Sequence, residues 1–404
     1  MKNIIITGAG GMIGPMLAKR LLNDGYHVVL TDLVQPQVPE GVVHPENATC
    51  FKGDICDPAF VQELIQAAQP LDAIFIFHGI MSAGSEANFD LSFKVNVRSV
   101  QDLVLALRQS APRVRVVYSS SQAVFGQPLP KRITDATMPT PEGTYGAHKL
   151  SSEIFINDMH RKGFIDAFIV RFPTVIVRPG APSNAAPSFL SGMIREPMHG
   201  EECVIPLTDR SYRAYVCSPS STIENLVRVL GLKSDMLPPH QRAIVFPGVS
   251  ATIQEMMDAL AKYGGEDKLE LLREETNPEF ERILRSWPED FDPATPDRLG
   301  LIRDKKAEDL VKEYIDVYCA MQDQINLARI RTLYTIRLLN VHLPYVKEDE
   351  AGEHQDRNLL KTLKRDLFHQ LDVRHGWVPE EGPALDVVVE HGDDLGPAAE
   401  VGRQ

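Results

Sequence analysis

Cysteine is scarce in this sequence, and the few cysteines form no pattern. Five are scattered over 404 residues without a CxxC pair, which fits neither a disulfide framework nor a zinc site. The twelve histidines show no HExxH or comparable metal-binding spacing. We therefore expect free thiols in a reducing compartment, and no bound metal.

Long apolar runs and an excess of positive charge are also missing. The first apolar run, Asn3–Thr7, is too short for a signal-peptide core or a membrane span, and no longer run follows it. The 55 acidic residues outnumber the 42 basic ones, which gives a net charge of −13. Such a chain repels a phosphate polymer or an anionic bilayer. These features predict a cytoplasmic protein whose partners include neither nucleic acid nor membrane.

The composition is otherwise that of a folded protein with room for two or three domains, because 43% of the residues are hydrophobic and 24% are charged. Up to about residue 120, short β-branched runs alternate with stretches of helical period, as in βαβ units. The predicted strands are Asn3–Thr7, His27–Thr31, Thr49–Lys52, Ala73–Phe77, Val114–Tyr118 and Ala167–Phe172. The predicted helices are Met12–Asp24, Pro58–Ala68, Phe89–Gln109 and Thr144–Lys162.

A glycine-rich turn follows the first strand. Gly8, Gly11 and Gly14 stand in GxxGxxG spacing, with Met12 and Ile13 between the last two, where the first helix begins. Such glycines allow close backbone approach, and the helix N-terminus presents free N–H groups to a pyrophosphate. A glycine pattern alone is weak, because many such segments are simple turns.

Acidic residues at two strand ends strengthen this interpretation. Asp32 closes the second strand 24 positions after Gly8, where a carboxylate can bind both ribose hydroxyls of an adenosine and repel a 2′-phosphate. No arginine follows Asp32, so NAD is favoured over NADP. Asp54, followed by Ile55, could hold the adenine amino group. The alternative for Asp54 is a helix N-cap.

These patterns predict an α/β fold, a Rossmann doubly wound parallel sheet with helices on both faces and a smaller C-terminal substrate lobe. The regular alternation ends at Pro173, and apolar residues recur every three or four positions from about 306 to 342. The predicted division is an NAD-binding domain over 1–175 with returning elements near 211–250, a substrate-binding lobe over 176–320, and a helical extension over 321–404 with a disordered end.

A candidate catalytic group lies further along the chain. Tyr145 and Lys149 form a YxxxK pair, one helical turn apart on the same face. A nearby Lys⁺ favours the phenolate of a tyrosine, which would otherwise be a poor base. Ser121 ends a serine cluster at the end of the fifth strand, where its hydroxyl can bind a reacting oxygen. A YxxxK pair alone is more often a surface feature.

In combination, these residues resemble the extended short-chain dehydrogenase/reductase family, also described as NAD-dependent epimerases/dehydratases. The GxxGxxG turn, Asp32, Gly53-Asp54, the segment 119–126 and the YxxxK pair follow the order and spacing of that family over roughly residues 2–320. Segments 78–82, 87–90 and 171–180 are similar to dehydrogenases of short sugar acids such as D-erythronate. The sequence departs from these at Gly79 and at residues 185–187.

The resemblance implies further site residues. It places His78, Gly79 and Asn96 near the cofactor, and Pro173 and Val175 beneath the nicotinamide carboxamide. The alternatives are that Asn96 forms a bulge inside its helix and that Pro173 only ends a strand. Ser82 belongs to the similar segment 78–82, and we expect it to contact the substrate. Three arginines are candidates for binding a substrate carboxylate, because a guanidinium fork suits that group; they are Arg178, Arg195 and Arg213.

The expected function is an NAD-dependent dehydrogenase that oxidises a secondary hydroxyl of a short sugar acid to the keto acid. Tyr145 takes the hydroxyl proton, Lys149 stabilises its phenolate and Ser121 holds the oxygen. A nucleotide-sugar epimerase or dehydratase, a biosynthetic ketoreductase and a cofactor-sensing regulator remain alternatives. The resemblance also implies pairing of subunits through helices, so we expect a homodimer.

Overall fold

The computed structural model describes residues 2–180 and 188–322. The substrate-loop residues 185–187 and almost all of the expected extension, including its apolar stripe, lie outside the described residues. A helix spans residues 307–322, so the expected helix over 306–342 is observed up to its residue 322.

Seven parallel strands form the central sheet, in the order β3-β2-β1-β4-β5-β6-β10. Their bounds are β1 Asn3–Thr7, β2 His27–Asp32, β3 Ala48–Lys52, β4 Leu71–Ile76, β5 Arg115–Ser121, β6 Asp166–Phe172 and β10 Ala243–Val245. The order reverses between β1 and β4, which is the switch point of a doubly wound sheet. The predicted Rossmann fold is confirmed, and the short β10 returns to its edge.

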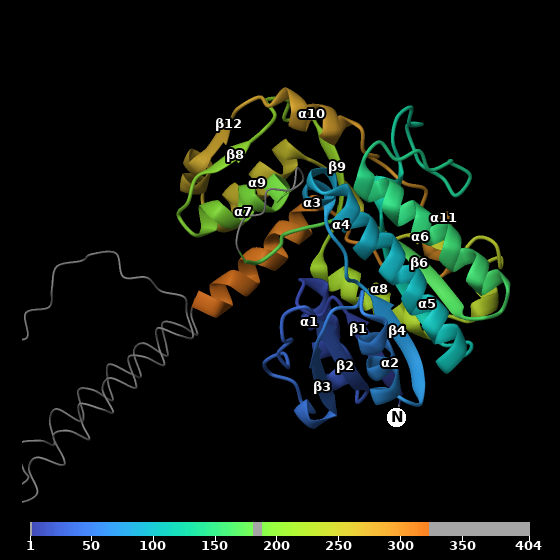
Figure 1. Ribbon diagram of the computed structural model, residues 1–404. Coiled ribbons are helices and arrows are strands. Elements are labelled where there is room, and N and C mark those ends of the chain that lie inside the picture. Colours follow the sequence, from blue (N-terminus) through green and yellow to red (C-terminus); the bar gives the residue numbers. More distant parts are fainter. Residues whose placement is uncertain (1, 181–187, 323–404) are drawn as a thin grey trace, which may run out of the picture. The chain divides into compact units, whose positions relative to one another are not determined.

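Helices cover both faces of the sheet, as Figure 1 shows. Side chains alternate between the faces, so Ile5 packs with one cluster while Ile4 and Ile6 pack with the other. The first cluster is covered by α2 (Pro58–Ala67), α5 (Ser99–Ser110) and α6 (Thr144–Arg161). The second is covered by α1 (Ile13–Asn23) and α8 (Pro219–Gly231).

The helix expected over Phe89–Gln109 is interrupted. It consists of α4 (Phe89–Phe93), a π-helical turn η2 (Lys94–Arg98) and α5. Asn96 lies in the π turn, where its amide binds the backbone of Ile80. Apolar periodicity cannot reveal this turn, because a tertiary contact of the Asn96 side chain accompanies it.

A second group of elements has a core of its own. Two small sheets, β11-β9-β7 and β12-β8, pack with helices and with Leu310, Val311 and Ile315 of the helix 307–322. The elements of this lobe, labelled in part in Figure 1, are β7 Thr174–Val175, α7 Phe189–Met198, β8 Cys203–Ile205, β9 Arg213–Cys217, β11 Val249–Thr252, α9 Ile253–Gly264, β12 Leu272–Glu274 and α10 Pro278–Arg285. Thr252 and Glu255 form a capping box at the start of α9.

Candidate active site

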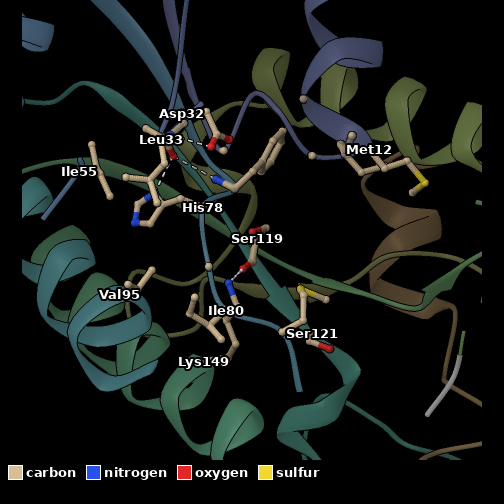
Figure 2. A pocket seen from close by; sticks show the side chains of 18 of the residues that line it. Met12, Asp32, Leu33, Ile55, His78, Ile80, Val95, Ser119, Ser121 and Lys149 are labelled. Atoms are coloured by element: carbon tan, nitrogen blue, oxygen red, sulfur yellow. Dashed lines mark hydrogen bonds between the residues drawn. The ribbon is translucent and has the colours of Figure 1, made fainter. Parts of the chain in front are cut away.

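A cavity of about 520 Å³ opens at the carboxyl ends of the central strands. Figure 2 shows Asp32 at one end of it and Ser121 with Lys149 at the other. Ligands of doubly wound sheets bind at this edge. Most of the predicted site residues line the cavity, namely Gly8, Gly11, Met12, Ile13, Gly14, Asp32, Asp54, Ile55, His78, Gly79, Ser121, Tyr145, Lys149, Pro173, Val175 and Arg178.

The glycine turn packs closely against its neighbours, with no room for side chains at two of its glycines. Gly8 has φ +68°, and a Cβ there would lie 2.5 Å from the backbone N of His78. A Cβ on Gly14 would lie 2.7 Å from Cα of Ala9, so α1 packs closely against the turn. No side chain caps the N-terminus of α1, which leaves its N–H groups available for a pyrophosphate. The turn therefore fits the phosphates of NAD.

Two backbone N–H groups hold the carboxylate of Asp32. Its Oδ2 accepts a hydrogen bond from Gly10 N at 2.9 Å, and its Oδ1 accepts one from Leu33 N at 2.7 Å. Among the described residues, Asp32 forms no ion pair with lysine, arginine or histidine. The carboxylate oxygens can accept further hydrogen bonds from ribose hydroxyls.

Asp54 does not cap a helix. The N-cap of α2 is Asp57, whose side chain accepts a hydrogen bond from Ala59 N at 2.9 Å. The Asp54 carboxylate instead accepts a bond from Cys56 N at 2.9 Å and lies 3.8 Å from Nζ of Lys94. The N-cap alternative for Asp54 is therefore wrong, and its side chain lines the cavity.

His78 joins three elements beneath the cavity. Its Nδ1 lies 2.8 Å from Thr7 Oγ1 and its Nε2 lies 3.0 Å from Ser99 Oγ. Burial, together with the charge of Lys149, lowers the pKa of His78 to about 3. The ring is neutral at physiological pH, so it shapes the cavity floor and carries no charge there.

The start of α6 presents Tyr145 and Lys149 to the end of β5. Gly146 permits this, because a Cβ there would lie 2.0 Å from the carbonyl oxygen of Ala123. Lys149 Nζ donates a hydrogen bond to the carbonyl oxygen of Ser119 at 2.7 Å, drawn as a dashed line in Figure 2. It lies 4.8 Å from the ring centroid of Tyr118 and 5.7 Å from that of Tyr145.

Burial shifts the titration of both α6 side chains. It raises the pKa of Tyr145 to about 12, opposed by the charge of Arg178 and a hydrogen bond with Ser121. It lowers the pKa of Lys149 to about 7, opposed by the charge of Glu153. The charge of Arg178 thus favours the Tyr145 phenolate, in addition to the role predicted for Lys149.

The three candidate arginines have different surroundings. Arg178 lines the cavity, where its Nε donates to the carbonyl oxygen of Val175 at 3.3 Å, and it forms no ion pair within the described residues. The buried Arg195 is engaged internally: it donates to the carbonyl oxygen of Arg178 at 2.9 Å and to Oε1 of Glu196 at 2.5 Å. Arg213 begins β9 and is exposed away from the cavity lining.

Ser82 and Asn96 also lie outside the cavity lining. Ser82 is the first residue of α3 (Ser82–Ala87). The Asn96 amide accepts a bond from Ile80 N at 2.8 Å and donates to Ile80 O at 2.9 Å, which fixes the loop after β4. A Cβ on Gly79 would lie 2.9 Å from Oδ1 of Asn96 and 3.6 Å from Nζ of Lys149. Glycine at this position therefore allows the loop, Asn96 and Lys149 to approach one another.

A cluster of Glu153, Arg171 and Ser120 behind the site was not predicted from the sequence. Glu153, Arg171 and Ser120 join α6, β6 and β5. The spacing contained a signal, because Glu153 follows Lys149 by four residues and so shares its helix face.

In the described ranges, no group of three or more His, Cys, Asp or Glu residues is arranged to hold a metal. No helix of these ranges is long and apolar enough to cross a membrane.

Comparisons with known proteins agree with this geometry. The NAD dependent epimerase/dehydratase family matches residues 4–218. A D-erythronate dehydrogenase of Haemophilus influenzae is 35% identical over 318 residues, covering 78% of this chain and 98% of the relative. One of Cupriavidus necator is 30% identical with the same coverage. The crystal structure of a nucleoside-diphosphate-sugar epimerase from Agrobacterium tumefaciens is 33% identical, with a TM-score of 0.72, 78% of this chain and 93% of that one covered.

Proposed function

The chain belongs to the NAD dependent epimerase/dehydratase family, and from this we propose that it oxidises a secondary hydroxyl of a short sugar acid, of the D-erythronate type, to the keto acid. It is an NAD-dependent oxidoreductase acting on CH–OH groups. The observation that carries the finer proposal is Arg178, a guanidinium without an ion-pair partner in the described residues that lines the same cavity as Tyr145.

NAD fits the described residues along the cavity. The N-terminus of α1 and the turn at Gly8, Gly11 and Gly14 would hold the pyrophosphate. Asp32 would bind the ribose hydroxyls, and Asp54 with Ile55 would border the adenine. His78, Gly79, Pro173 and Val175 line the end of the cavity near Tyr145. When bound, NAD⁺ supplies a hydride acceptor.

The side chains of the chain supply the proton chemistry and the orientation. Tyr145 accepts the proton of the substrate hydroxyl, and Ser121 donates a hydrogen bond to the reacting oxygen. The positive charges of Arg178 and Lys149 lie near the phenol and stabilise its deprotonated form. Arg178 binds the substrate carboxylate, while Arg195 holds the backbone of Arg178 in place and stays away from the substrate.

A substrate screen tests this proposal. Purified protein with NAD⁺ is offered aldonates and uronates of four to six carbons, while NADH absorbance is followed. Matched polyols that lack the carboxylate serve as controls. We expect kcat/KM for an acid to exceed kcat/KM for its polyol by at least about a hundredfold, because only the acid forms the guanidinium–carboxylate contact with Arg178. Equal rates would contradict the assignment of Arg178, and no NADH with any acid would contradict the substrate class.

The epimerase name of the Agrobacterium tumefaciens structure supports a second candidate. A nucleotide-sugar epimerase would use the same Tyr145 and Lys149 but retain the oxidised intermediate and the reduced cofactor. Incubation with nucleotide sugars would then change the sugar without accumulating NADH. Stoichiometric NADH release from a sugar acid distinguishes the dehydrogenase.

Three broader expectations also remain proposals. We propose that residues 1–175, with returning elements near 211–250, bind NAD and that 176–320 otherwise form the substrate-binding lobe, because Arg178 lies in the latter range. A homodimer agrees with the exposed apolar side chains of Leu105 on α5 and Ile154 on α6, and light scattering tests it. A cytoplasmic location agrees with the five free cysteines.

A further inference from the structure

A buried ion pair lies behind Lys149, and the proposed reaction does not use it. Glu153 is only 3% exposed. Its Oε1 accepts hydrogen bonds from Ser120 Oγ at 2.5 Å and from Arg171 Nε at 2.9 Å, and its Oε2 accepts one from Arg171 Nη2 at 2.6 Å. Three hydrogen bonds therefore fix the position of this carboxylate, one helical turn beyond Lys149.

Lys149 itself has no such partner. It is 3% exposed, and its ammonium donates to a neutral carbonyl, that of Ser119. It forms no ion pair within the described residues, although burial of an unpaired ammonium is strongly unfavourable.

Ionisable groups on several elements face Lys149. Tyr145 lies on the same helix, and Tyr118 reaches it from β5 with the face of its ring. His78, beyond β4, is neutral, since the charge of Lys149 itself contributes to the low pKa of that ring. Glu153 supplies the negative charge that acts on Lys149 in this set.

We propose that Glu153 is a positioning residue that keeps Lys149 protonated, while Arg171 and Ser120 hold the Glu153 carboxylate in place. The inference rests on the role proposed above for Lys149. Without the Glu153 charge, Lys149 loses its proton at a lower pH and no longer stabilises the Tyr145 phenolate. The opposition between burial and Glu153 in setting the pKa of Lys149 agrees with this role.

The pH dependence of stability tests the inference without a substrate. The difference in melting temperature between the wild type and Lys149→Met isolates the contribution of Lys149. The ordinary pKa of 10.5 applies to the unfolded chain, whereas the folded value is about 7. The unfolded chain therefore binds more protons between these values, and the difference rises with pH from about 7 upward.

The difference in melting temperature is then measured between Glu153→Gln and Glu153→Gln/Lys149→Met. We expect this difference to begin to rise about one pH unit lower than in the wild-type background, because the amide keeps the size of the side chain but loses the charge. An unchanged onset, or an onset at higher pH, would overturn the proposal.

A charge-preserving variant controls for packing. Arg171→Lys keeps the positive charge beside Glu153 but cannot form the two-pronged contact. We expect a lower melting temperature and an onset that moves less than in Glu153→Gln, because the charge of Glu153 remains. If Arg171→Lys moved the onset as far as Glu153→Gln does, the geometry of the pair rather than the Glu153 charge would control Lys149, and the inference would fail.

A further variant covers the case in which Glu153→Gln does not fold. Glu153→Gln/Arg171→Gln replaces the ion pair by two amides and leaves no unpaired charge at this position. We expect the onset of the rise in melting-temperature difference to move to lower pH here too, and an onset that does not move would overturn the proposal. Failure of every sugar acid to reduce NAD⁺ would instead remove the proposed function and leave these stability measurements unaffected.

Discussion

The two ends of the cavity are built in different ways. At the cofactor end, the turn at Gly10 and Gly11 is exposed, and backbone N–H groups fix the Asp32 carboxylate. At the other end, Tyr145 is 8% and Lys149 3% exposed, and burial shifts the pKa of both. Shape and backbone donors thus suffice to bind a cofactor, whereas proton transfer requires side chains removed from water. Substitutions at the two ends should have different signatures.

The largest effect is expected for Tyr145→Phe. The ring still fills its site, but no proton acceptor remains. We expect kcat to fall by roughly 10²- to 10⁴-fold, with the Kd for NAD⁺ changed less than about threefold, because the variant keeps the cofactor end intact. Stopped-flow NADH formation and calorimetry measure the two quantities. Retention of more than about a hundredth of kcat would contradict the role of Tyr145.

Arg178→Gln should combine a binding defect with a shifted pH profile. Loss of the carboxylate contact raises KM by roughly 10- to 100-fold. The charge of Arg178 lowers the pKa of Tyr145, and a base must be deprotonated to act. Its removal therefore moves the rise of kcat/KM to higher pH. Arg213→Gln is the matched control, since Arg213 is exposed and outside the cavity lining. Equal behaviour of the two variants would refute this assignment.

Asp32→Asn should change cofactor choice with little effect on the chemical step. The wild type should prefer NAD⁺, because the Asp32 carboxylate repels a 2′-phosphate. The amide removes that repulsion, so the ratio of kcat/KM for NAD⁺ to that for NADP⁺ should fall roughly tenfold. Steady-state kinetics with both cofactors provides the measurement, and a wild type that uses both equally would exclude this role for Asp32.

The smallest effects separate two neighbouring aspartates. Asp57→Ala removes the N-cap of α2 and should lower stability by roughly 0.5–2 kcal/mol with NAD⁺ affinity unchanged. Asp54→Ala should weaken NAD⁺ binding a few-fold, because its carboxylate lines the cavity. Thermal unfolding and calorimetry of both variants check this contrast. If Asp57→Ala were the variant with weaker binding, the cofactor role of Asp54 would be wrong.

The contrast between regions also explains what could be predicted from the sequence. Strands β1, β2, β4, β5 and β6 contain apolar runs that are buried in the sheet, whereas the edge strand β3 is less buried. The sequence pattern nevertheless predicted each of the six strands within a few residues. In the second lobe, β7 has two residues and β8 three, too few to show a period. Tertiary pairing defines such strands, and their positions could not be read from local pattern.

The candidate site divides in a similar way. Gly8, Asp32 and Tyr145 stand in recognisable motifs, and the family expected from these motifs is confirmed. The surroundings of Arg178 and Arg195 depend on contacts between distant segments, so the sequence offered both as equal candidates. The same holds for the Glu153–Arg171 pair, because Arg171 lies eighteen residues beyond Glu153 on a different element.

The passage from β6 to β7 has a consequence for how this protein can be altered. Pro173 alone separates the last residue of β6 from the first of β7, so the chain leaves the central sheet and enters the second lobe within one residue. Arg178 follows from the lobe side, whereas Tyr145 and Lys149 belong to α6. In the proposed reaction, acid recognition therefore comes from the lobe and proton transfer from α6. Substitutions in the segment around 176–198 that retain Arg178 offer a route to new acids with the α6 groups kept.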